Sequence, residues 1–118
     1  MPTSILNSIK HALGVPEDYT VFDQDIIMHI NTVLGTLHQL GVKTNDDFAI
    51  EGVTETWEDY IPTGPLLKSV LSFVYVKVRL IFDPPSTSFT IEAFERIASE
   101  LEFRINVQAE GAFENEPV

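Results

Sequence analysis

The sequence predicts an all-α fold, a small bundle of about four helices over residues 4–13, 23–40, 66–82 and 87–107. In each segment apolar residues recur at the spacing of one helical face, and glycine or proline stands near the boundaries. The chain has 118 residues, of which 44% are hydrophobic, as is usual for a single globular domain. We therefore expect a helical domain over residues 1–108 and an acidic, flexible tail over residues 109–118.

The first two helices have the clearest boundaries. Residues 4–13 carry one apolar stripe, and Gly14 and Pro16 supply the stop. The apolar residues of the second segment fall within about 140° of the helical circumference, which indicates one buried face. We expect Asp23 to cap this helix and Gly41 to follow its end as a C′ residue.

Residues 42–64 predict an irregular acidic loop that holds a helical turn or a short strand. Asn45, Gly52 and Pro62 are typical of turns, and residues 48–50 form at most a short strand. Thr54 and the acids after it favour a helical turn with Thr54 as its cap. Such a turn lays three apolar side chains onto the core: Trp57, Tyr60 and Ile61.

Residues 66–82 fit two patterns. The valines at 74, 76 and 78 alternate with polar or aromatic residues as in a strand. However, a run of this length between Pro65 and Pro84 exceeds the usual strand, so we predict a helix. Lys77 then lies among apolar side chains, and its ammonium must reach water or meet an acid from elsewhere.

The last helix carries apolar residues on two sides. Ser86, Thr87 and Ser88 offer N-caps for it. The main stripe consists of Ile91, Phe94, Ile97, Ala98, Leu101 and Ile105. Nearly opposite lie Phe89, Ala93, Phe103 and Val107. A chain this small can hardly cover both sides from within, so the second stripe predicts a contact with a partner.

Composition excludes several classes of function. The 18 acidic and 7 basic residues give a net charge of −11, and a negative charge disfavours a protein that binds nucleic-acid phosphates. The chain has no cysteine, which excludes disulfides and thiolate chemistry. No secretory signal and no apolar run of bilayer length is evident, so we expect a soluble, cytoplasmic-type chain that contacts no membrane.

No catalytic, metal or cofactor site is predicted. The three histidines lack the spacing of a zinc site, because His29 and His38 point to opposite sides of one helix. The acids of residues 46–59 do not follow a calcium-loop pattern, which favours a solvated loop. Asp23 and Asp25 suit a helix start better than a catalytic pair. We therefore expect that the protein is not an enzyme.

One long string resembles a known family. Residues 66–85 (LLKSVLSFVYVKVRLIFDPP) look like the small head-tail connector proteins of tailed bacteriophages, the neck adaptors that bind beneath the portal. The likeness extends to residues 25–31 (DIIMHIN), 56–60 (TWEDY) and 89–107, and covers residues 5–108 in all. Its most specific part is the RLIFDPP run of residues 79–85.

The resemblance implies an all-helical structural protein without enzymatic activity or cofactor. Its expected partners are further copies of itself in a ring, commonly of twelve, then the portal protein and a stopper or tail-terminator protein. DNA is expected to pass through the ring without specific binding. The expected location is the virion neck, with the host cytoplasm during assembly. The alternative is a small acidic helical regulator that binds other proteins and has no catalytic activity.

The resemblance also suggests roles for particular residues. The second stripe of the last helix is the natural subunit contact in a ring, and Lys77 could find its acid there. The acidic loop, through Asp46, Asp47, Glu51 and Glu55, is expected to face the lumen or the next neck protein. The tail, through Phe113 and Val118, is expected to bind the portal by folding on contact.

Overall fold

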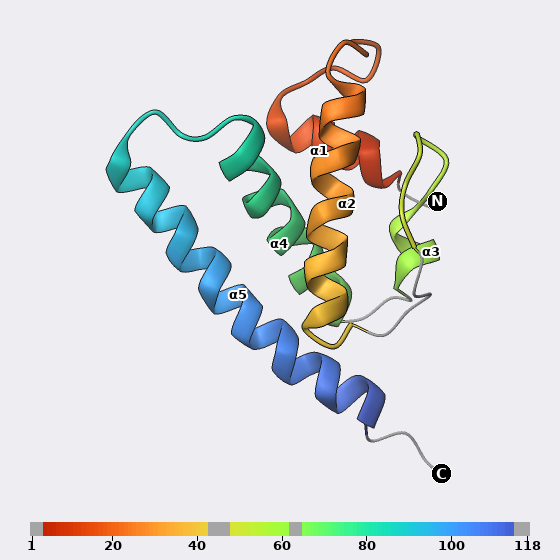
Figure 1. Cartoon of the computed structure of the whole chain (residues 1–118), viewed down its shortest axis with the longest axis vertical. Helices are drawn as coiled ribbons and strands as arrows, with labels where there is room; N and C mark the ends of the chain where they lie inside the picture. Colours follow the sequence, from red (N-terminus) through yellow and green to blue (C-terminus); the bar gives the residue numbers. More distant parts are fainter. Residues whose placement is uncertain (1–3, 43–47, 62–64, 115–118) are drawn as a thin grey trace.

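The computed structural model describes residues 4–42, 48–61 and 65–114, and these residues form an all-α fold (Figure 1). The helices are α1 (Ile5–Leu13), α2 (Asp23–Gln39), α3 (Trp57–Tyr60), α4 (Pro65–Phe82) and α5 (Ser88–Glu114). Within these residues the only β pairing is an isolated antiparallel bridge between Ser4 and Thr56. The predicted helical bundle is confirmed.

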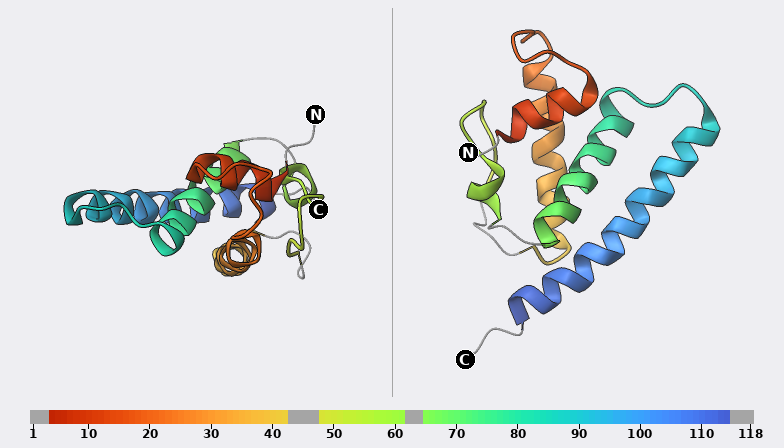
Figure 2. Two further views of the ribbon diagram at one scale, coloured as in Figure 1. Left: turned by 90° about the horizontal axis from the view of Figure 1, so that it is seen from above. Right: turned by 180° about the vertical axis from the view of Figure 1, so that it is seen from behind.

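The helix α4 lies at the centre of the bundle. It packs against α2 on one side and α5 on the other, and α1 contacts both α2 and α4. Figure 2 shows the short α3 on the side of the molecule away from the start of α5. The extents of 47, 34 and 23 Å describe a flattened molecule, whose longest helix, α5, lies at one edge.

Burial explains why residues 66–82 form a helix despite their alternating pattern. Val74 and Val78 are fully buried and Val76 is nearly so, and α4 packs against both α2 and α5. A helix covered on two sides requires apolar residues around most of its circumference. The pattern that resembled a strand is therefore the pattern of a central helix.

The turn at α3 fastens the acidic loop to α1. The indole Nε1 of Trp57 donates a hydrogen bond to Ser8 Oγ at 2.7 Å, and the backbone N–H of Ile5 donates to the carbonyl of Glu55 at 3.0 Å. The predicted burial of Trp57, Tyr60 and Ile61 is confirmed.

Two predicted N-caps are wrong. The cap of α3 is Thr56, not Thr54, because Thr56 and Asp59 form a reciprocal capping box. The cap of α2 is Phe22, which makes no side-chain cap bond, and Asp23 is the first helical residue. Its carboxylate instead pairs with Lys10 of α1, a partner that local sequence cannot indicate.

The end of α2 follows the prediction and also anchors α5. Gly41 has a φ of 104°, the left-handed conformation that glycine adopts freely. The side-chain amide of Asn106 donates a hydrogen bond to the carbonyl of Leu40 at 2.8 Å. Beside this contact Ala109 is only 1% exposed.

The helix α5 is longer than predicted. Thr87 caps its start, since Thr87 Oγ1 accepts a hydrogen bond from the backbone N–H of Thr90 at 3.2 Å. The helix continues to Glu114, through residues 109–114 of the segment predicted as a flexible tail. The burial of Ala109 gives this extension a packing contact. One member of the main stripe, Ile97, is 43% exposed.

No helix among the described residues is long and apolar enough to cross a bilayer.

The burial of Tyr60 predicts a loss of stability at alkaline pH. Desolvation raises the pKa of Tyr60 from 10.0 to about 12. Between these values the unfolded chain has released the proton that the folded chain still holds, so the free energy of unfolding falls as pH rises. Urea unfolding at a series of pH values from 9 to about 12 should show a shallower decline for Tyr60→Phe than for the wild type. The matched control is Tyr19→Phe at an exposed position, and equal declines for Tyr60→Phe and the wild type would contradict the prediction.

Candidate interaction surfaces

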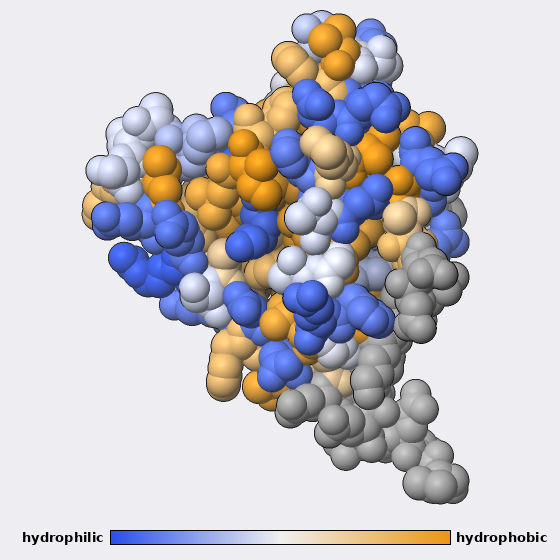
Figure 3. Space-filling view, viewed as in Figure 1, coloured by the Kyte–Doolittle hydropathy of each residue, from blue (hydrophilic) through white to orange (hydrophobic). Residues whose placement is uncertain are grey.

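The second apolar stripe of the last helix is uncovered. We call Phe89, Ala93, Phe103 and Val107 the outer face of α5. Phe89 is 81% exposed, Phe103 74% and Val107 51%, whereas Ala93 is half-buried. Figure 3 shows hydrophobic atoms protruding at the lower left edge of the molecule, where α5 runs. An isolated chain thus leaves large aromatic side chains in water, which is typical of interaction sites.

Phe103 lies between two shallow surface depressions. One depression is lined on α5 by Ser99, Glu100, Phe103, Arg104, Val107 and Gln108. The other lies between α5 and the end of α2, where Leu40 forms its opposite wall. The ring of Phe103 borders both depressions, so a partner that fills either one contacts this side chain.

Lys77 is half-buried on α4. Its ammonium lies 5.9 Å from the ring centroid of Phe73, within range of a cation–π interaction. Among the residues that the structure describes, it makes no ion pair. The contact with Phe73 partly compensates the charge, and the predicted acid from another subunit stays a prediction.

The acidic loop uses some of its carboxylates for its own structure. The two oxygens of Glu55 accept hydrogen bonds from the backbone N–H groups of Glu51 and Gly52 at 2.9 and 3.3 Å. Asn31 of α2 holds the neighbouring backbone, because its side chain accepts from the N–H of Ile50 and donates to the same residue's carbonyl. Glu51 is exposed, and Asp46 and Asp47 lie outside the described residues.

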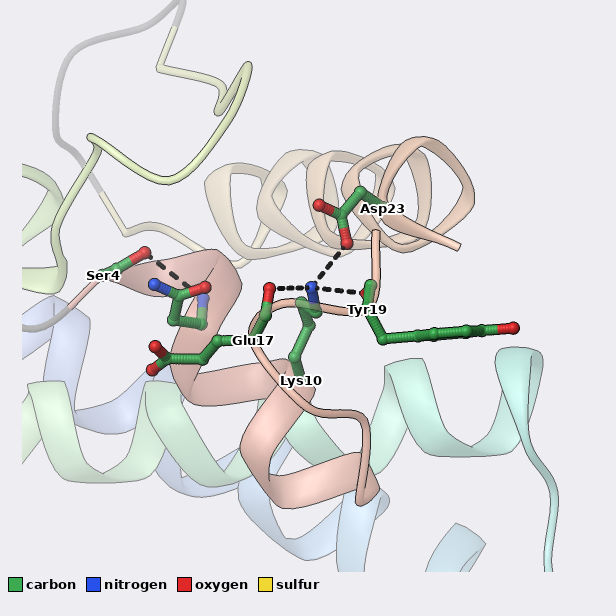
Figure 4. A network of polar contacts seen from close by, with 6 residues as sticks. Ser4, Lys10, Glu17, Tyr19 and Asp23 are labelled. Carbon is green, nitrogen blue, oxygen red and sulfur yellow. Dashed lines mark hydrogen bonds and ion pairs between the residues drawn. The ribbon is translucent and has the colours of Figure 1, made fainter. Parts of the chain in front are cut away.

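The segment between α1 and α2 is held by a buried ammonium that the sequence did not single out. Lys10 is fully buried, and its Nζ donates to the carbonyls of Glu17 and Tyr19 at 3.0 and 2.9 Å. The same Nζ lies 2.8 Å from Oδ1 of Asp23 (Figure 4). The ammonium thus has three oxygen partners, which compensates much of the cost of its burial.

A weak signal for this site was present in the sequence. Lys10 lies four residues after Leu6, at the edge of the apolar stripe of α1. Two of its three partners are backbone carbonyls, which any sequence offers. Pattern analysis can therefore show that Lys10 borders the core but not which oxygens it meets.

The described residues contain no group of three side chains suited to hold a metal ion. Phe113 belongs to the last turn of α5, although its side chain is outside the described part, as is all of Val118.

A family model described as phage connector protein matches residues 5–112. No curated protein and no solved structure matches the chain.

The pairing of Asp23 with Lys10 predicts unequal effects of two similar substitutions. Asp23→Asn leaves the buried ammonium without a charged partner and should lower the free energy of unfolding by about 3 kcal/mol. Asp25 is exposed in the same first turn of α2. Asp25→Asn removes the same charge from the helix start and should lower the free energy of unfolding by about 0.5 kcal/mol or less. Urea unfolding measures both. Equal effects would mean that the ion pair adds nothing beyond the helix dipole.

Proposed function

The chain belongs to the phage connector protein family, and we propose that it forms a ring beneath the portal that joins the head to the tail. The family has a structural role at the head-tail junction of the virion and is typically non-catalytic. In the proposed assembly, about twelve copies bind the portal on one side and a stopper or tail-terminator protein on the other. The observation that carries the proposal is the family match over residues 5–112, joined to an uncovered apolar helix face.

In this ring the outer face of α5 contacts the neighbouring subunit. A ring requires a head-to-tail contact between two different surfaces of each copy. The exposed rings of Phe89 and Phe103 supply apolar area of the kind that anchors such contacts. Lys77 of α4 is a further member of the proposed interface, with an acid of the adjacent copy as its partner.

The acidity of the chain suits a channel for DNA. Twelve copies, each with a net charge of −11, carry about −132 formal charges. A lumen lined by carboxylates repels phosphates, so DNA passes without being retained. We assign this lining, or the contact with the next neck protein, to the acidic loop with Asp46, Asp47, Glu51 and Glu55. The loop's attachment to α1 and α2 fixes its base to the helical body.

We assign portal binding to the C-terminal segment with Phe113 and Val118. The segment combines acids with two bulky apolar residues, which a partner surface can bury. Phe113 lies in the last turn of α5.

Mass determination by light scattering, on the protein alone and mixed with portal rings, tests the function. We expect the wild type to bind portal rings in a fixed ratio of subunits. Phe103→Glu should bind fewer copies, because the new carboxylate disrupts the subunit contact, while its exposed position keeps the change in unfolding free energy within about 0.5 kcal/mol.

A wild-type protein that stays a 13.2 kDa monomer and ignores portal rings would contradict the proposed function. The small regulatory domain would then become the leading interpretation.

Neutralising the acidic loop tests its assignment. The triple variant Asp46→Asn, Asp47→Asn and Glu51→Gln should lower phage titre through poorer DNA exit or stopper docking, with unfolding free energy nearly unchanged. Glu55 is left intact because its carboxylate holds the loop backbone. The matched control removes three exposed charges elsewhere, through Asp83→Asn, Glu92→Gln and Glu95→Gln. An unchanged titre in the loop variant would contradict the assignment.

A further inference from the structure

Residues 14–22, between α1 and α2, expose apolar side chains while hydrogen bonds hold their backbone in place. Val21 is 70% exposed, Tyr19 46% and Phe22 39%. Beneath them the ammonium of Lys10 binds two carbonyls of the segment, and further backbone bonds close turns at both ends. We call residues 14–22 the clipped loop. Because hydrogen bonds already order its backbone, binding of a partner costs the loop little conformational entropy.

The clipped loop is acidic as well as apolar. Glu17 and Asp18 are exposed within it, and Asp25 is exposed just beyond it in the first turn of α2. Residues 11–42 contain no lysine or arginine. A complementary surface must therefore combine apolar side chains with basic ones.

The same chain carries such a surface on α5. Of its seven basic residues, Lys10 is buried, Lys77 lies against Phe73 and Arg79 lies near Asp83. Arg96 and Arg104 are exposed on α5, and the spacing of a helix places both among the outer-face residues. Arg104 also lines the depression beside Phe103 and Val107.

We propose that the clipped loop of one copy binds the outer face of α5 of the next copy. This inference rests on the proposed function and identifies the second surface that a ring contact needs. Val21, Tyr19 and Phe22 meet Phe103 and Val107, while Asp18 and its acidic neighbours face Arg96 and Arg104. Copies that each carry −11 repel one another, so a contact between them has to place opposite charges together.

The positions of the two surfaces suit a head-to-tail contact. Figures 1 and 2 show the segment between α1 and α2 at the opposite end of the molecule from the second half of α5. In the space-filling view hydrophobic atoms stand out at both places. One copy can thus offer both surfaces at once, and repetition of the contact yields a closed ring or an open filament.

Cross-linking of introduced cysteines tests the pairing, since the chain has none of its own. Thr20→Cys marks the clipped loop and Glu100→Cys marks the outer face of α5, and both positions are exposed. The two full-length variants are mixed in the presence of portal rings and treated with a flexible bis-maleimide reagent, and mass spectrometry identifies the joined peptides. We expect the 20-to-100 product to exceed the product of a control pair, Thr32→Cys with Glu100→Cys, by about tenfold.

Two further variants make the result specific. Val21→Glu in the Thr20→Cys chain and Phe103→Glu in the Glu100→Cys chain should each reduce the 20-to-100 product to the control level. Circular dichroism checks that the variants fold. A 20-to-100 yield equal to the control, or a dominant 100-to-100 product from two α5 faces, would overturn the pairing.

The outcome is separable from that of the proposed function. If cross-linking fails while the wild type still binds portal rings in a fixed ratio, only the pairing is wrong. If the 20-to-100 product forms but portal rings are ignored, the pairing stands and the neck assignment fails.

Discussion

The burial of α4 is the constraint on which the rest of the fold depends. This helix is apolar around most of its circumference, so it is stable in water only when helices cover it from two sides. The helix α2 covers one side and α5 covers the other, and α1 contacts both α2 and α4. Among the described residues no further helix is left to cover the far side of α5. The exposure of Phe89 and Phe103 follows from the number of helices available in a chain of this length.

The spacing of apolar residues predicted which segments form helices better than it predicted where those helices begin and end. The stripe of α1 and the positive φ at Gly41 agree with expectation because both depend on residues near in sequence. The cap of α2 was misassigned because Asp23 is held by Lys10, thirteen residues earlier, rather than by its own backbone. The end of α5 was placed too early because the hydrogen bond from Asn106 to Leu40 and the burial of Ala109 are tertiary features that the spacing of nearby residues does not reveal.

Of the two candidate surfaces, one could be predicted from the sequence and the other could not. The outer face of α5 could be predicted because two apolar stripes on one helix are visible in the sequence, and the structure leaves the second one exposed. The clipped loop could not be predicted, because its backbone is bound by a buried ammonium that donates to the carbonyls of Glu17 and Tyr19. Helical periodicity reports where a side chain points, whereas a bond to a distant carbonyl depends on the tertiary fold.

Charge places a further condition on the proposed assembly. At physiological ionic strength the screening length is about 8 Å, so adjacent subunits feel one another's net charge while more distant ones do so much less. Two arginines on α5 can offset this repulsion only locally, and Glu100 lies on the same side of the helix. A contact of this kind is weak between two free copies and is strengthened when a template holds the copies side by side, because the second binding step becomes intramolecular. The acidity that suits a DNA channel therefore also favours a ring that forms on the portal over one that forms in free solution.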